Sequence, residues 1–196
     1  MMVFSLVTIL SVSPLLWSPN DPNGQIEVIS SGKFKIKGQS NIAPFECEFQ
    51  PYSSTDTLSI GYTKEAKPCY YFHNAITELD IAAFDCGNRV MNNDFCEMLH
   101  QEQHPRLKIQ LKDATISTDN NGGSATITIG IAGLEKDYNL PFEWHQQDGK
   151  YQVLATIHLD IKDFELIPPQ KLIGLLKVRN EITVEVEYEI RPLVFE

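Results

Sequence analysis

Apolar and polar residues alternate with a period of two over most of the second half of the chain. Near the C-terminus, Ile182, Val184 and Val186 alternate with Glu185 and Glu187. The same pattern occurs at residues 107–111, 125–131, 140–144 and 153–161. Such alternation puts one side of each segment in an apolar interior and the other in water, as in an antiparallel sheet. The pattern therefore predicts a series of half-buried strands.

Further strands are predicted in the first half of the chain, at residues 32–37, 42–49, 57–62 and 76–84. Turn residues separate the later strands, with Asn-Asn-Gly-Gly at 120–123 and Gln-Asp-Gly at 147–149. Both sequences are typical of hairpin turns. The total is about eight or nine strands. Because closure removes exposed strand edges, the fold class predicted is all-β, a single extended antiparallel β-barrel of about eight strands.

One short helix is predicted between residues 85 and 105. Polar residues able to cap a helix come first, and Pro105 is expected to end it. Between them, apolar residues recur at helical spacing: Met91, Phe95, Met98 and Leu99. A second apolar stretch at 172–176, after two prolines, is expected to form a helical turn or a lid over a barrel mouth.

Length and charge narrow the class of protein. A chain of 196 residues with 42% hydrophobic residues fits one domain with a sizeable core, which we place at residues 25–192. The formal net charge is −10, and an acidic surface repels phosphate backbones. Nucleic acid is therefore not expected as a partner. The pattern leaves the oligomeric state open, a dimer included.

The first 17 residues carry no charged side chain, and residues 3–10 are almost wholly apolar. This is typical of the hydrophobic region of a secretory signal, so residues 1–18 are a candidate signal segment. The protein is then expected to be periplasmic or secreted. A first strand is the alternative. The apolar run is shorter than the ~20 residues of a spanning helix, so a membrane-spanning protein is not predicted.

The four cysteines, Cys47, Cys69, Cys86 and Cys96, match no zinc-ligand spacing. In an exported protein an even number favours one or two disulfides, although buried free thiols are the alternative. The sequence does not choose among the pairings. The disulfide that we expect is Cys47 with Cys86, because both lie at the ends of strands predicted to be neighbours.

The inward residues of the predicted strands are the candidate ligand-binding site. They are Phe34, Ile36, Ile109, Ile127, Ile129, Phe142, Ile157, Leu159, Val184 and Val186. On alternation alone they line a cavity or simply pack against one another. Lys171, Lys177 and Arg179 flank the predicted lid, where they meet a ligand head group or only confer solubility.

Catalytic and metal chemistry has little support in the sequence. The common catalytic and nucleotide-binding motifs are absent, so the chain is predicted not to be an enzyme and to need no cofactor. His100 and His104 lie four apart, which would put them on one face of the predicted helix. Cys96 and His100 have the same spacing. The histidine pair has no acidic or Cys partner at a recognisable spacing, so no metal site is predicted. The Cys–His pair has a spacing that would allow nucleophilic catalysis, but a disulfide or a buried thiol is favoured for Cys96.

Two blocks of the chain resemble the YceI-like family. The first is IAAFDCGNRVMNNDFCEMLHQEQHPRLKI at 81–109, and the second, within 125–190, contains GLEKDYNLPFEW, LDIKDFELIPPQKLIGLLKV and NEITVEVEYEI. With the opening strands the resemblance spans roughly residues 25–190. His104 departs from the Tyr more usual before the proline, and Arg179-Asn180 replaces a Gly-Asp turn.

The resemblance implies a lipocalin-like barrel that holds a long isoprenoid chain, and it implies no catalytic residues. The leading hypothesis is an exported carrier or sequestering protein for an isoprenoid lipid or quinone-like molecule. The alternative is a filled barrel that acts as an envelope stress or interaction protein through the acidic face of residues 185–189. A redox or metal-linked role through the cysteines or histidines is a third hypothesis.

Overall fold

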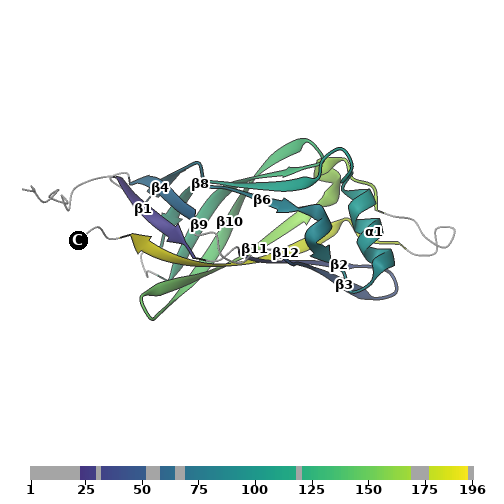
Figure 1. Cartoon of the computed structure of the whole chain (residues 1–196), viewed down its shortest axis with the longest axis horizontal. Coiled ribbons are helices and arrows are strands. Elements are labelled where there is room, and N and C mark those ends of the chain that lie inside the picture. The colour runs from purple at the N-terminus through teal and green to yellow at the C-terminus, as the bar shows by residue number, and fades with distance from the viewer. Residues whose placement is uncertain are drawn as a thin grey trace, which may run out of the picture.

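The computed structural model describes residues 23–29, 32–51, 58–64, 69–117, 121–168 and 177–193. Strands dominate these residues, and all their pairings are antiparallel (Figure 1). The strands are β1 (Asn23–Val28), β2 (Lys33–Gln39), β3 (Pro44–Phe49), β4 (Leu58–Lys64), β5 (Cys69–His73), β6 (Ile76–Asp80), β7 (Phe84–Asp85), β8 (Arg106–Ile116), β9 (Gly122–Ile131), β10 (Leu134–Gln147), β11 (Lys150–Asp160) and β12 (Glu181–Leu193). The helical segments are α1 (Arg89–Met98) and the 3₁₀ helices η1 (Ile81–Ala83) and η2 (Ile161–Phe164).

The strands form a closed antiparallel barrel of eight strands, as predicted. Strands β8 to β12 are consecutive neighbours in the barrel wall. The last of them, β12, pairs with β1 along its C-terminal half and with β2 along its N-terminal half. In the same way, β8 pairs with both β5 and β6. The short strands β1 and β2, and β5 and β6, therefore continue each other along the barrel, which explains why twelve strands make an eight-strand wall.

Two tight turns join the long strands of the wall. The β10–β11 turn is Asp148-Gly149, with φ of 52° and 74°, at the predicted position. The β9–β10 turn is Ala132-Gly133, with φ of 50° and 81°. Two central residues at positive φ are the pattern of the turn that matches the twist of a hairpin. The turn predicted at 120–123 is wrong in extent, because Gly122 and Gly123 already belong to β9.

Several predicted strand bounds are wrong for local reasons. The strand predicted at 42–49 begins at Pro44, because the Ser40 hydroxyl oxygen accepts from the Ala43 amide at 3.0 Å and holds a turn. The strand predicted at 76–84 is interrupted by η1. The strand predicted to reach Ile161 ends at Asp160, whose carboxylate accepts from the Lys162 amide at 2.9 Å and starts η2. Strands β1 and β5 were not predicted.

Helix α1 begins where predicted but ends earlier. Asn88 caps it, its side-chain oxygen accepting from the Met91 amide at 3.0 Å. The helix ends at Met98 rather than near Pro105, and His100 has φ of 54°, which stops the helical backbone. The histidine pair is therefore not on one helix face, nor are Cys96 and His100. Instead, the His104 ring packs against Gly133, in the turn between β9 and β10.

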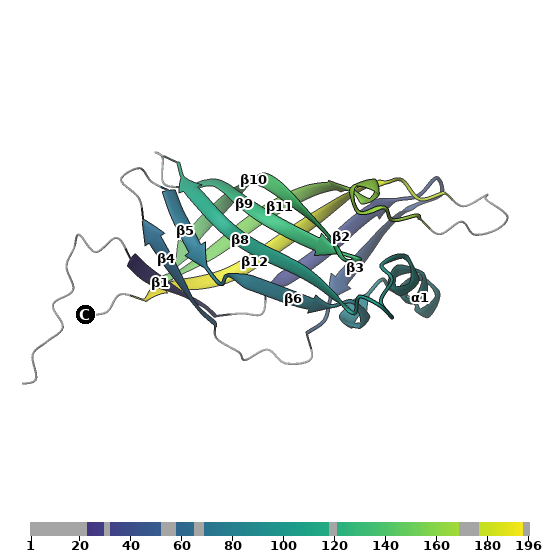
Figure 2. The same ribbon diagram turned by 90° about the horizontal axis from the view of Figure 1, so that it is seen from above.

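The apolar interior forms two clusters. The larger one occupies the α1 end of the barrel and includes Phe34, Phe84, Phe95 and Phe164. The smaller one consists of Val28, Ile60 and Ala75 with partly buried neighbours, and it lies within the strands at the opposite end (Figure 2). Leu111 and Tyr188 pack against both clusters. The core is therefore divided near the middle of the barrel, where these two residues lie between the clusters.

Candidate functional site: the barrel interior at the α1 end

An apolar cavity of about 70 Å³ lies within the larger core cluster. Its surface is formed entirely by apolar atoms. The barrel strands contribute the aliphatic side chains that alternate inward, such as Ile109, Ile129 and Ile157. Helix α1 contributes Phe95 and Met98. An apolar surface of this kind recognises apolar ligands by burial rather than by hydrogen bonds.

Most of the predicted site residues lie around this cavity. Those that line it are Phe34, Ile36, Ile109, Ile129, Ile157, Leu159 and Val184. Ile127 is buried in the same cluster but is not part of the cavity wall. Phe142 and Val186 instead belong, together with Phe34, to a second concavity described below. The alternation of the strands thus identified the inner face but not which part of it is hollow.

Other residues of the cavity were not among the predicted site residues. They are Phe45, Leu79, Phe84, Phe95, Met98, Leu99, Leu107, Ile131, Ile161, Leu166, Val178 and Ile182. The helical spacing of Phe95, Met98 and Leu99 predicted an amphipathic helix, and its apolar face contributes to the cavity wall. This helical spacing is the sequence signal that could have identified these residues as part of the site.

The charged residue of the cavity wall is Arg179. Since the cavity surface is apolar, only the aliphatic stem of Arg179 contributes to it. Residues 177–179 are fixed in place by two hydrogen bonds. The Arg179 amide donates to the Gln39 carbonyl at 2.8 Å, and the Lys177 amide donates to the Asn41 side chain at 2.9 Å. The residues of the predicted lid, 172–176, and Lys171 lie outside the described residues.

A disulfide lies beside the cavity, between Cys47 and Cys86. This is the pair expected from the sequence. It joins β3 to the residue that follows β7. Strands β3 and β7 share only the pairs Glu48–Asp85 and Phe49–Phe84. Cys69 and Cys96 are free, and burial raises the pKa of the Cys96 thiol. The disulfide therefore holds the barrel wall together where its backbone pairing is shortest.

Polar side chains inside the barrel are paired. Thr77 and Tyr188 share a hydrogen bond of 2.9 Å between their hydroxyl oxygens. Tyr188 is largely buried, and that burial raises its pKa. Among the described residues, no buried side-chain nitrogen or oxygen lacks a partner. The described interior thus holds no unpaired buried polar group that would call for a polar ligand.

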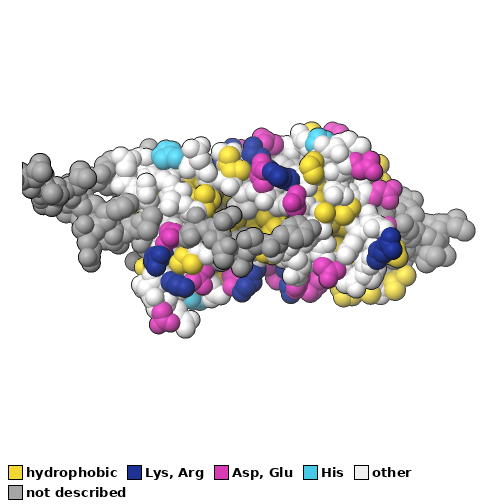
Figure 3. Space-filling model, viewed as in Figure 1, with side chains coloured by type: hydrophobic (Ala, Val, Ile, Leu, Met, Phe, Trp, Pro, Cys, Tyr) yellow, Lys and Arg dark blue, Asp and Glu magenta, His cyan; other side chains and the backbone are white. Residues whose placement is uncertain are grey.

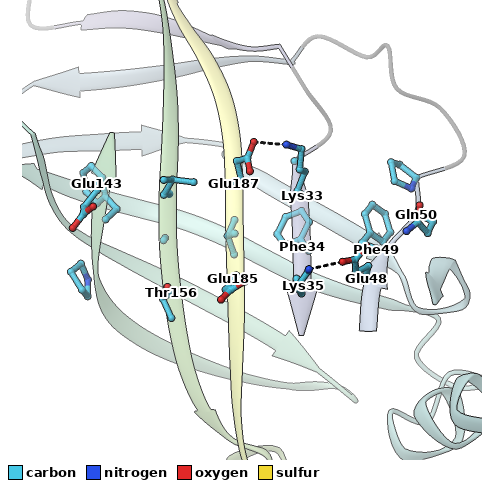
Figure 4. Close-up of a pocket in the computed structure, with 17 residues that line it drawn as sticks. Lys33, Phe34, Lys35, Glu48, Phe49, Gln50, Glu143, Thr156, Glu185 and Glu187 are labelled. Atoms are coloured by element: carbon cyan, nitrogen blue, oxygen red, sulfur yellow. Dashed lines mark hydrogen bonds and ion pairs between the residues drawn. The ribbon is translucent and has the colours of Figure 1, made fainter. Parts of the chain in front are cut away.

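A second concavity, of about 940 Å³, lies along β10, β11, β12, β2 and β3 (Figure 4). It is open and bears charged side chains, so we call it the charged groove. Lys33 pairs with Glu187 at 2.6 Å, and Lys35 pairs with Glu48 at 2.6 Å. Positive and negative side chains are likewise interspersed on the surface in Figure 3. Its lining has two lysines and four glutamates, and both lysines are already paired with glutamates, so the charged groove offers no free positive charge to an anionic ligand.

Within the described ranges, no group of three or more His, Cys, Asp or Glu side chains is arranged to hold a metal ion. In the same part of the chain, no helix is both long and apolar enough to cross a membrane.

Comparison with known proteins finds the fold but no relative in sequence. No protein-family model and no curated protein matches the chain. The solved structure of BcnA from Burkholderia cenocepacia has a TM-score of 0.58 and 12% identity, covering 81% of this chain and 95% of BcnA. A polyisoprenoid binding domain from Saccharophagus degradans, implicated in plant cell wall breakdown, has a TM-score of 0.55 and 11% identity. That match covers 85% of this chain and 98% of the domain.

These matches extend over nearly the whole of both known structures, so the similarity concerns the complete barrel and not one hairpin. This barrel is the fold that the resemblance of the sequence to the YceI-like family implies. The chain therefore has the YceI-like fold.

Proposed function

We propose that this chain is an exported protein that binds an apolar isoprenoid-type lipid inside its barrel and carries or sequesters it. The observation that carries the proposal is the cavity between the barrel strands and α1, whose surface is wholly apolar. The similar domain from S. degradans is a polyisoprenoid binding domain, which supports this class of ligand.

The chemistry of the cavity wall fits a hydrocarbon chain. Each buried CH₂ group contributes about 0.8 kcal/mol, so a prenyl chain needs no polar partner in the interior. A polar ligand would leave its hydrogen-bonding groups unpaired against side chains such as Ile129 and Leu159, at a cost of about 1–3 kcal/mol for each group. Binding and not catalysis is the role that we assign to this interior.

The size of the cavity sets a condition on the ligand. A volume of about 70 Å³ takes about five water-sized groups, which is comparable with one isoprene unit. A longer chain therefore enters only if side chains of the wall move. Met98 is suited to such movement, because an unbranched thioether adapts to irregular spaces at low cost.

Export is part of the proposal. The Cys47–Cys86 disulfide supports a periplasmic or secreted location, since disulfides persist in oxidising compartments. The apolar N-terminal segment 1–18, which supports the same location, lies outside the described residues.

The alternative, an interaction protein that uses the acidic face of β12, has less support. Lys37 pairs with Glu185 at 2.6 Å, and Lys150 pairs with Glu189 at 2.5 Å. Glu187 is paired with Lys33 as described above. The carboxylates of this face are thus neutralised within the protein, which weakens the case for an acidic docking surface.

The experiment is a measurement of farnesol binding by native mass spectrometry and by competition with a fluorescent apolar probe. Leu159 lines the cavity, whereas the neighbouring His158 is exposed on the same strand. Leu159→Trp fills the cavity and should lower farnesol affinity by at least about tenfold, since it removes apolar contact area. His158→Trp is the matched control and should bind as wild type does.

Ile129→Phe provides a milder filling variant for the same comparison, with circular dichroism as the check of folding. A wild-type protein that takes up no farnesol and yields no lipid on organic extraction would reject the proposal. Equal weakening by Leu159→Trp and His158→Trp would show that the ligand does not bind in the interior.

A further inference from the structure

The hydrogen bond between Thr77 and Tyr188 crosses the lumen of the barrel. Thr77 is on β6 and Tyr188 is on β12, and these strands are not neighbours in the sheet. Strand β6 pairs with β8, whereas β12 pairs with β11, β1 and β2. The 2.9 Å contact therefore joins two separated parts of the wall through the interior.

The tyrosine ring is held from its other sides as well. Phe34 contacts it edge to face, with ring centroids 5.6 Å apart and an interplanar angle of 88°. Gly32 lies against the same ring, and a Cβ atom at that position would be 2.7 Å from a ring carbon of Tyr188. Phe49 packs in turn on Phe34, with centroids 6.1 Å apart. The ring is thus fixed in one position by an aromatic cluster, a hydrogen bond and a glycine.

Tyr188 also stands between the two apolar clusters. Phe34 forms part of the cavity wall on one side. On the other side, Tyr188 packs against the cluster of Val28, Ile60 and Ala75. A chain that lies in the cavity and extends along the barrel therefore meets Phe34 and then Tyr188 before it reaches the second cluster.

We propose that Tyr188, fixed by Thr77 and Phe34, is a partition that limits how far a prenyl chain extends into the barrel and so sets the preferred chain length. The inference rests on the proposed function, because it concerns the same apolar interior. Isoprene units on the cavity side of the partition are buried and add affinity. Units beyond its limit stay outside and add none.

The test is a series of prenols of increasing length: geraniol, farnesol, geranylgeraniol and solanesol. In wild type, the affinity should rise with each added unit and then reach a plateau. Tyr188→Ala should move the plateau to a longer prenol, with a gain of at least about tenfold for the first prenol beyond the wild-type plateau. Tyr188→Leu is the second variant, which keeps an apolar side chain in case the alanine variant does not fold.

Two control variants separate the partition from general loosening of the barrel. Tyr188→Phe keeps the ring and removes only the hydroxyl, so its plateau should stay at the wild-type length. Tyr138→Ala removes a tyrosine ring that packs on Phe164 instead, and its plateau should also stay. An unchanged plateau in both Tyr188→Ala and Tyr188→Leu would overturn the partition. A wild-type protein that binds none of the prenols would instead overturn the proposed function.

Discussion

Cys47 and Cys86 join two strands of the barrel that share only two residue pairs of backbone. Both cysteines are almost fully buried beside the apolar cavity. Elsewhere the wall is held by long ladders, such as the ten residue pairs of β11 with β12. The disulfide therefore replaces, at one position, the backbone hydrogen bonds that secure the rest of the barrel.

Removal of this disulfide should destabilise the protein. It closes a loop with a sequence separation of 39, and loops of this size stabilise a fold by about 2–4 kcal/mol. Cys47→Ala/Cys86→Ala should lose that amount of unfolding free energy, as measured by urea denaturation. Cys69→Ala, which removes a free thiol, is the control and should change stability much less. If the double variant is as stable as this control, the wall does not depend on the bridge.

The strands of the barrel were largely predictable from the sequence because one side of each strand is buried. In β12, Val184 and Val186 face the core, and Glu185 and Glu187 pair with lysines of β2. The alternation of β2 itself, with lysines at 33, 35 and 37, carries the same information. The alternation within each strand shows which of its faces is buried. It can be recognised without knowing which strands are its neighbours.

Pairing between distant strands was not predictable in this way. Strand β1 pairs with β12, which lies more than 160 residues later in the chain, and the local sequence of β1 does not predict this pairing. The division of β12 between β1 and β2 is also a pairing of distant segments, and the sequence around Gly32 does not reveal it. The size of the cavity likewise depends on how α1 packs on the barrel. Register, closure and volume are properties of tertiary packing, which alternation does not encode.

The N-cap of α1 is expected to matter for both stability and binding. Asn88→Ala removes the acceptor for the Met91 amide and should cost about 1 kcal/mol in unfolding free energy. Since Phe95 and Met98 line the cavity, fraying of the helix should also weaken farnesol binding. Asn93→Ala, at an exposed position of the same helix, is the control and should not lower either quantity. Both variants are compared by urea denaturation and farnesol titration. Equal unfolding free energies and equal farnesol affinities in the two variants would contradict the role of the cap.

Acid should weaken the ion pair of β2 with β12. The hydrogen bond from Lys33, followed by that from Gln152, lowers the pKa of Glu187 below 4.5. A lowered pKa means that the stabilisation is present above the unfolded-state value and is lost as pH falls through the folded-state value. Because the pair is largely exposed, its contribution should be at most about 1 kcal/mol.

Glu187→Gln should therefore reduce the loss of stability between pH ~5 and the acid limit, as measured by urea denaturation over a pH series. Glu143→Gln removes a carboxylate of the charged groove that has no ion pair among the described residues. It serves as the control and should keep the wild-type pH profile. Identical profiles for the two variants would show that the Lys33–Glu187 pair does not contribute.

Alkaline pH should destabilise the α1 end of the barrel through Tyr138. Burial, followed by the hydrogen bond that its hydroxyl donates to Asp163 at 3.1 Å, raises the pKa of Tyr138 to about 12. Between pH ~10 and ~12 the unfolded chain loses this phenolic proton while the folded protein keeps it, so stability falls as pH rises. Tyr138→Phe keeps the ring that stacks on Phe164 and should show a smaller fall over that window in urea denaturation. Phenolate absorbance of the folded wild type provides the independent check, because titration of every tyrosine near pH 10 would contradict the raised pKa.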